Sequence, residues 1–151
     1  MPIVQDGTTT TRLDPDTGER FLPLRRQLGV SSFGCNQIVL QPGQRGRIHR
    51  HQRQEEVYLV LEGSLTLLVE GDATELGPHE LVRVAPQVRR QLVNRGPGRV
   101  VLLALGGAND DWGAHPPRDG EAFGDWSDEE PVPPQELSMP PDLSPGELRT
   151  S

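Results

Sequence analysis

The sequence predicts an all-β fold built as one small barrel, and three observations support this. Between residues 20 and 106, short runs of Val, Leu and Ile end at Gly, Pro or Asn. These runs begin roughly 8 to 12 residues apart, which is typical of sandwiches and barrels. No segment in this span has an amphipathic helical period of useful length. The length of 151 residues suits a single domain with a real core.

Each run is an expected strand bounded by its own turn residue. In chain order the runs are NQIVLQPG, RIHRH, EEVYLVLEG, SLTLLVEG, ATELGP, ELVRVAP, RRQLVNRG and RVVLLALGG. The junction LEGSLTL predicts a hairpin with a tight turn at Glu62–Gly63. A small β-barrel fits this series best, and such barrels hold ligands in their mouth or interior.

The distribution of charge predicts the domain limits. Residues 1–106 carry thirteen Arg against eleven Asp and Glu, whereas residues 107–151 carry two Arg against eleven acids and eight of the fifteen prolines. We expect an N-terminal arm at 1–20, the barrel at 21–106 and an acidic Pro-rich tail at 107–151. Its last part, 128–151, has the composition of a disordered segment. Three of the six aromatic residues lie just before that part, so we expect 109–127 to pack against the domain: Trp112, Phe123 and Trp126.

Composition excludes several function classes. The net charge of -7 argues against nucleic acid as a partner, because phosphate binding needs a basic footprint. All fifteen basic residues are Arg, so lysine-based chemistry such as a Schiff base is absent. A single cysteine, Cys35, indicates a reducing compartment. The chain shows no secretory signal, and its longest apolar run, Val100 to Leu105, is far short of the roughly 20 residues of a membrane helix. We therefore expect a cytoplasmic protein without a membrane partner.

A pair of histidines one residue apart is the main chemical signal. His49 and His51 point to the same face of a strand, so their imidazoles can converge on one ion at ~2.1 Å. Glu56 begins the next expected strand, with Tyr58 on its side. If that strand pairs with residues 47–51, Glu56 completes a set of two histidines and one carboxylate. Such a set suits Fe, Mn, Ni or Zn with positions left open.

The spacing around these residues resembles a known family. Five residues match the first conserved motif of the cupin superfamily, with five, one, four and six residues between them: Gly43, His49, His51, Glu56 and Gly63. The later stretch HELVRVAPQVRRQLVN resembles a degenerate second motif, with Pro86 and Asn94 in place and Gln91 for its histidine. The resemblance covers about residues 30–106. It implies a single cupin β-barrel of the type-2 class, also described as a double-stranded β-helix or jelly roll.

The resemblance also implies a ligand set. In metal-binding cupins the two histidines and the glutamate of the first motif bind a divalent metal with the histidine of the second. Carried across, the ligands are His49, His51, Glu56 and Gln91. The Gln91 amide keeps the charge of the site but is a weaker donor, so a histidine at this position would tighten metal binding. Glu55, the rival carboxylate, would point to the opposite face.

Three further side chains are candidates for binding or catalysis. Arg47 has the strand parity of His49, and Arg89 has that of Gln91. Two inward arginines would favour an anionic substrate, whereas arginines at the barrel mouth would lie in water. Tyr58 either donates a hydrogen bond to a bound ligand or fills the barrel with its hydroxyl satisfied.

Three functions stay open at this level. The first is a metal-dependent enzyme acting on a small organic molecule; dioxygenase, decarboxylase and isomerase activities are all known among cupins. The second is a metal-free isomerase or epimerase, with His49 or His51 as general base and Tyr58 as acid. The third is a non-catalytic protein that binds a small ligand. In each case we expect a homodimer, because exposed strand edges are a liability in a lone barrel.

Overall fold

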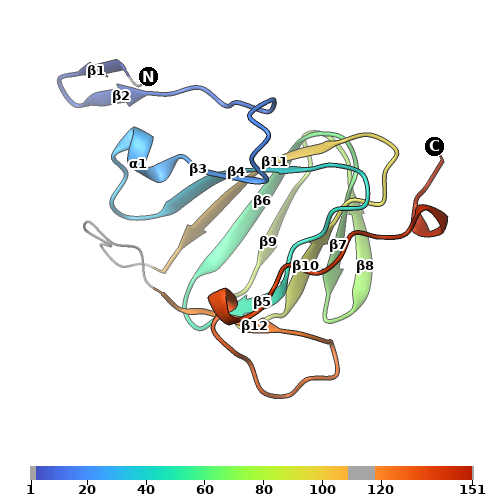
Figure 1. Cartoon of the computed structure of the whole chain (residues 1–151). Helices are drawn as coiled ribbons and strands as arrows, with labels where there is room; N and C mark the ends of the chain where they lie inside the picture. The colour runs from blue at the N-terminus through green and yellow to red at the C-terminus, as the bar shows by residue number, and fades with distance from the viewer. Residues whose placement is uncertain (1–2, 109–117, 151) are drawn as a thin grey trace.

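The computed structural model describes residues 3–108 and 118–150 and contains two five-stranded antiparallel sheets (Figure 1). One sheet has the order β12-β5-β10-β7-β8 and the other the order β3-β4-β11-β6-β9. The strands of the first sheet are β5 (Ile48–His51), β7 (Leu65–Val69), β8 (Asp72–Leu76), β10 (Arg90–Val93) and β12 (Gly120–Phe123). Those of the second are β3 (Phe21–Pro23), β4 (Gly34–Leu40), β6 (Glu55–Glu62), β9 (Leu81–Val84) and β11 (Val100–Gly107).

The remaining elements are short and lie outside the two sheets. They are the hairpin of β1 (Ile3–Gln5) and β2 (Thr8–Thr10), helix α1 (Arg25–Leu28), and the 3-10 turns η1 (Pro134–Glu136) and η2 (Pro145–Glu147). The all-β prediction is therefore confirmed. None of the helices within the described ranges is long and apolar enough to cross a bilayer.

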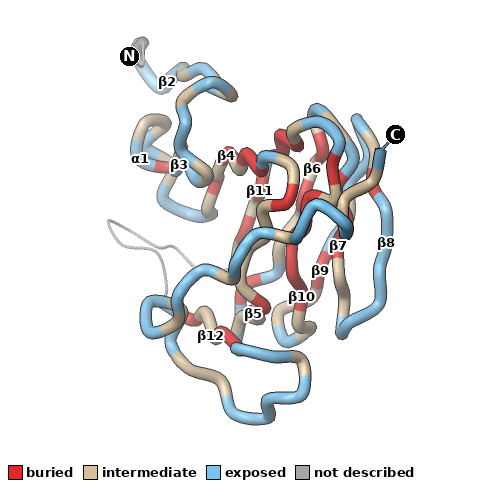
Figure 2. The backbone as a smooth tube through the Cα atoms, turned by 45° about the vertical axis from the view of Figure 1, so that its right-hand side comes forward, coloured by how far each residue is buried: buried red, intermediate tan, exposed pale blue. Residues whose placement is uncertain are grey.

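The core lies between the two sheets, where alternate residues of the long strands point inward. In β4 and β11, buried residues alternate with less buried ones, as expected of strands with one face toward a core. Figure 2 shows buried stretches in β6, β10 and β11, whereas β8 is largely exposed. The central cluster is mostly aliphatic: Leu40, Tyr58, Val60, Leu65, Leu67, Leu76, Val84, Leu92, Val100, Leu102 and Ala104.

The turn at Glu62–Gly63 exists, but it does not close a hairpin. Strand β6 pairs with β11 and β9, whereas β7 pairs with β10 and β8, so the chain changes sheets at this turn. Gly63 has a φ of +82°, and a Cβ there would lie 2.2 Å from the carbonyl oxygen of Arg99. Only glycine fits this position without displacing the backbone.

The segment after residue 106 contributes a strand to the barrel. Strand β12 pairs with β5 along its whole length, from Gly120 opposite His51 to Phe123 opposite Ile48. It therefore covers an edge of the sheet that holds the two histidines (Figure 1). The expected boundary at 106 falls before this strand. The chain then doubles back, and Ala122 and Val132 exchange two backbone hydrogen bonds of 2.8 and 2.9 Å.

Residues 131–150, here called the C-terminal strap, follow a defined path in front of β5 and β10 (Figure 1). This differs from the disorder predicted for 128–151. Arginines of the barrel donate to strap carbonyls, from Arg45 Nε to Pro141 O at 2.9 Å and from Arg47 Nε to Leu137 O at 3.0 Å. The backbone of Leu143 donates to Gly43 O at 2.8 Å. Composition does not record such partners elsewhere in the chain, and the disorder of 128–151 in solution stays a prediction.

Two of the three tail aromatics lie against barrel arginines. Phe123 is buried, and the guanidinium groups of Arg50 and Arg89 lie 5.1 and 5.2 Å from its ring centre. Arg89 also lies 5.7 Å from the ring of Trp126, within the range of a cation–π interaction. The expected contact of Trp112 lies outside the described residues.

Deleting residues 128–151 is expected to lower the melting temperature by at least about 2–4 °C, which corresponds to ~1 kcal/mol for a chain of this size. The deletion removes the bridge to Ala122 and the hydrogen bonds to Gly43, Arg45 and Arg47, each worth about 0.5–1.5 kcal/mol before the entropy of the strap is offset. Differential scanning calorimetry of the full and shortened chains measures this. Identical melting curves would show that the strap is free in solution.

Candidate metal centre

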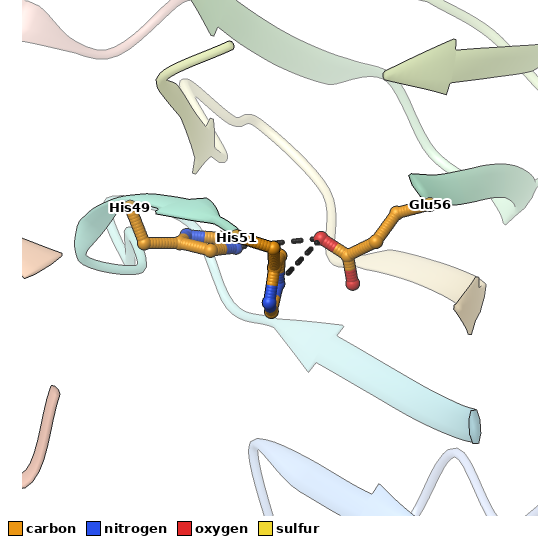
Figure 3. Close-up of side chains that lie close together, drawn as sticks. All are labelled: His49, His51 and Glu56. Carbon is orange, nitrogen blue, oxygen red and sulfur yellow. Dashed lines mark ion pairs between the residues drawn. The ribbon is translucent and has the colours of Figure 1, made fainter. Parts of the chain in front are cut away.

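Three potential metal ligands meet between the two sheets. His49 and His51 lie on β5 and Glu56 lies on β6, and these strands belong to different sheets. The expected pairing of the two strands is therefore wrong, but the residues still converge, because the sheets face each other. Their ligand atoms lie within 4.8 Å of one another. In Figure 3 both imidazoles point toward the Glu56 carboxylate.

The hydrogen bonds of the two imidazoles fix which nitrogen faces Glu56. His49 Nδ1 lies 3.1 Å from the carbonyl oxygen of Arg47, and His51 Nδ1 lies 3.0 Å from Asp119 Oδ1. A carbonyl and a carboxylate only accept, so each Nδ1 carries a proton and donates it. Each Nε2 then directs its lone pair toward Glu56 Oε1, at 3.5 Å from His49 and 3.2 Å from His51. Three acceptors face one another, an arrangement that a proton or a cation between them would stabilise.

A buried arginine, Arg90, also contacts the Glu56 carboxylate. Arg90 on β10 is 0% exposed, and its guanidinium lies 2.7 Å from Glu56 Oε1. The same group donates to the backbone carbonyls of Pro86 at 3.0 Å and Val88 at 2.7 Å. The Tyr58 hydroxyl donates to Glu56 Oε1 at 2.8 Å. Glu56 is thus held in place by one group from β10 and one from its own strand β6.

The charges of the cluster keep Glu56 ionised. Burial raises the pKa of Glu56, but the hydrogen bonds and charges that His49 and His51 supply once Nε2 is also protonated lower it well below its usual value. For His51, burial lowers the pKa, and the Glu56 and Asp119 carboxylates outweigh this and raise it. Burial raises the pKa of Tyr58, so its hydroxyl keeps its proton and acts as a hydrogen-bond donor.

The expectation that Gln91 supplies a fourth ligand needs correction. Arg90 points toward Glu56, so the next residue of the strand points to the other face. The Gln91 amide donates to the carbonyl oxygen of Gly46 at 2.9 Å and lines a second cavity, beside Leu137 and Trp126. In the second cupin motif, three residues lie between the histidine and the asparagine. Three residues also lie between Arg90 and Asn94, so Arg90 occupies the position of that histidine. Counting back from Asn94 instead of forward from Pro86 would have found it.

The structure separates the two candidate arginines. Arg47 lines the same cavity as the ligand cluster, and its Nε donates to the strap. Arg89 lies elsewhere: it pairs with Glu70 at 2.9 Å and donates to the carbonyl oxygen of Trp126 at 2.8 Å. Arg89 was expected to point inward because it shares a strand face with Gln91. Both residues point away from the cluster. Glu55 is exposed, as expected, and pairs with Arg83 at 2.6 Å.

A cavity of about 570 Å³ adjoins the cluster. Its polar lining consists of the ligand residues, two arginines and three uncharged polar residues: His49, His51, Glu56, Arg20, Arg47, Asn36, Gln54 and Tyr58. Much of the remaining wall is apolar and includes Phe21, Ile38, Leu40, Leu92 and Met139. A mostly apolar cavity with a few convergent polar groups is typical of small-molecule sites.

Asp119 contacts the ligand cluster, and no pattern in the sequence pointed to it. It is 6% exposed and contacts His51, which lies 68 positions away in the chain. No local spacing connects the two. Arg90, by contrast, had a local signal in its distance to Asn94.

Part of the chain matches a known protein family. Residues 36–106 match the family model described as the cupin domain. This segment is a cupin domain. No protein of curated function is significantly similar to the chain.

Solved structures support the same fold. A cupin protein from Bacteroides fragilis superposes with a TM-score of 0.60 at 19% identity, covering 67% of this chain and 84% of that one. A sugar phosphate isomerase of the cupin superfamily from Silicibacter pomeroyi gives a TM-score of 0.56 at 25% identity, covering 64% and 75%. The cupin domain of a transcriptional regulator from Enterobacter cloacae gives 0.52 at 23% identity, covering 66% and 100%. The cupin fold is thus shared by proteins with different roles.

The position of Arg90 leads to a prediction about the fourth ligand. Arg90→His is expected to tighten Ni²⁺ binding by at least about tenfold, because it adds an imidazole and removes a positive charge from beside Glu56. Gln91→His is expected to leave the affinity unchanged, because that side chain faces away from the cluster. Ni²⁺ titration into the chelator-stripped variants, at a temperature where circular dichroism shows both folded, measures this. Tighter binding by Gln91→His alone would mean that Gln91 is the inward residue.

Proposed function

We propose that this cupin domain binds one divalent metal ion through His49, His51 and Glu56 and uses it to transform a small anionic molecule. The observation that carries the proposal is the convergence of two Nε2 lone pairs on the Glu56 carboxylate, with both Nδ1 protons already donated elsewhere. Two imidazoles and one carboxylate are a donor set that Fe, Mn, Ni and Zn accept.

Arg90 modifies this site without removing its donors. Its guanidinium holds Glu56 ionised and oriented, but its positive charge opposes that of a metal ion. We therefore expect weaker binding than in a site with four neutral or anionic ligands. When bound, the ion supplies a Lewis acid with open positions, which polarises a carbonyl or, for iron, nickel or copper, activates dioxygen. The apolar walls exclude water, and Arg47 offers a charge-assisted contact to an anion.

Isomerisation of a sugar phosphate is the first reaction to test among the open classes. Arg20 and Arg47 line the cavity and suit a phosphate or carboxylate group. The similar structure from Silicibacter pomeroyi, at 25% identity, is a sugar phosphate isomerase. Decarboxylase and dioxygenase reactions are to be tested next.

A metal-free acid–base reaction is the second candidate, and the position of Arg90 favours it. A guanidinium already supplies a positive charge beside Glu56 where metal-binding cupins have a histidine. His51, backed by Asp119, has the arrangement of a general base with an orienting carboxylate. Tyr58, the acid expected from the sequence, is a weak proton donor here because its pKa is raised.

The experiment that separates these functions uses full-length protein stripped of metal. Portions are reconstituted with Fe²⁺, Mn²⁺, Ni²⁺ or Zn²⁺ and assayed for aldose phosphate isomerisation, carbon dioxide release and oxygen uptake. Activity that returns with a metal and is absent in His49→Ala supports the first proposal. Activity in the stripped protein that His51→Ala abolishes supports the second. Saturable ligand binding without any turnover would contradict both and indicate a binding protein.

Homodimer formation and a cytoplasmic location stay predictions. Sedimentation of the purified protein tests the first, and a pure monomer at micromolar concentration would contradict it. The edge strands β3 and β9 carry exposed apolar side chains, Phe21 and Leu81, which a partner would cover.

A further inference from the structure

We propose that Asp119 is a positioning residue that fixes the tautomer of His51 and thereby aims its Nε2 lone pair into the metal centre. The inference rests on the proposed metal site. It adds that the segment following the matched cupin segment, and not the cupin segment itself, supplies this residue. Asp119 lies thirteen positions after the matched segment 36–106 and directly before β12.

Backbone pairing brings Asp119 to the site. Strand β12 lies beside β5 with Gly120 opposite His51, and the carbonyl oxygen of Asp119 accepts a hydrogen bond from Gln52 N at 3.0 Å. The side chain is 6% exposed and faces His51. Its position is therefore determined by the sheet and not by a free loop.

Four donors surround the Asp119 carboxylate. Oδ2 accepts from the backbone N–H of Arg53 at 2.8 Å and of Gln54 at 2.9 Å. Oδ1 accepts from the Gln54 amide at 2.6 Å and lies 3.0 Å from His51 Nδ1. The carboxylate only accepts, so His51 Nδ1 has to donate to it, and in the neutral imidazole Nε2 then carries the lone pair. A carboxylate behind a metal-binding histidine commonly has this role.

Asp119→Asn is expected to reverse the tautomer. The two backbone N–H groups can only donate, so they retain the amide oxygen at the Oδ2 position. The amide nitrogen then faces His51 and donates to Nδ1, and the Gln54 amide has to turn so that its oxygen faces the new NH₂ group. The ring proton moves to Nε2, which can no longer coordinate a metal. An amide in place of an orienting carboxylate has this effect on histidine in other proteins.

Glu121→Gln is the matched control. It makes the same chemical change two residues further along the same segment, where Glu121 pairs with Arg50 at 3.0 Å. Glu121 contacts none of the three ligand residues among the hydrogen bonds of the described chain. An effect on His51 that is common to both variants would therefore reflect general loosening of β12.

The experiment records the ring nitrogen shifts of ¹⁵N-labelled full-length protein, stripped of metal, at a pH where His51 is neutral. Wild type and Glu121→Gln are expected to show a protonated Nδ1 and a bare Nε2 on His51, and Asp119→Asn the reverse. Zn²⁺ titration is expected to show a loss of about 10–100-fold in affinity for Asp119→Asn and little change for Glu121→Gln. Thermal melts confirm that each variant is folded.

Each outcome decides the inference. If neutral His51 of the wild type has its proton on Nε2, the inference is wrong. It is also wrong if wild type and Asp119→Asn have the same His51 tautomer. If the tautomers change as expected but wild type binds no metal, Asp119 positions His51 and the proposed metal function fails instead. The two claims are therefore distinguishable.

Discussion

Replacing Arg90 with methionine is expected to lower the free energy of unfolding by about 3–5 kcal/mol, the range for breaking one side of a buried ion pair. Arg90 is fully buried and donates to Glu56 and to the carbonyls of Pro86 and Val88. Methionine fills much of the same space but leaves these acceptors without a donor. Urea denaturation followed by circular dichroism measures the change.

Two controls make this result specific. Arg83→Met removes an arginine from the exposed pair with Glu55 and is expected to cost less than about 1 kcal/mol. Adding Glu56→Gln to Arg90→Met removes the unpaired charge. The double variant should therefore lose less free energy of unfolding than the two single variants lose together. If Arg90→Met and Arg83→Met cost the same, the Arg90–Glu56 pair does not stabilise the fold.

His51→Ala is expected to weaken Zn²⁺ or Ni²⁺ binding by more than about 100-fold, beyond the 10–100-fold cost of losing an outer partner of a ligand. Two remaining ligands, His49 and Glu56, rarely retain an ion. The fold should persist, because the Asp119 carboxylate keeps its donors from Arg53 and Gln54. Isothermal titration of chelator-stripped protein measures the affinity.

The matched control replaces a histidine outside the site. His79 lies in the exposed turn between β8 and β9 with a φ of +73°, which asparagine tolerates. His79→Asn is expected to leave metal affinity unchanged. Equal, weak binding by wild type and His51→Ala would contradict the proposed metal site and favour the acid–base alternative.

The fold and three site residues were predictable because their signals are local. The run-and-turn pattern predicted an all-β domain, and the spacing of His49, His51 and Glu56 placed them in the first cupin motif. The reason first offered for their meeting was wrong, since β5 and β6 lie in different sheets. A single sequence does not specify which strands pair, and here the site forms across the barrel.

The inward face of β10 was missed by one residue. Side chains alternate along a strand, so a shift of one position exchanges the inward and outward sets. Counting from Pro86 placed Gln91 inside, whereas the structure places Arg90 there. A buried, charged residue was also the less expected choice, because arginine is rarely buried without a partner, and its partner Glu56 lies 34 positions away.

The C-terminal part was the least predictable. Its acidic, Pro-rich composition is typical of disorder, and the sequence indicated only that 109–127 packs against the domain, not that this part supplies β12 and Asp119. The strap is held through its carbonyl groups by Arg45 and Arg47, and proline keeps its carbonyl although it lacks an N–H. Such contacts depend on residues almost a hundred positions away.

The most direct test of the metal site is anomalous diffraction from crystals of the full chain soaked with Zn²⁺ and measured at the zinc absorption edge. We expect one strong peak at about 2.0–2.2 Å from Nε2 of His49, Nε2 of His51 and a carboxylate oxygen of Glu56. No peak between these residues, with Arg90 still paired to Glu56, would contradict it.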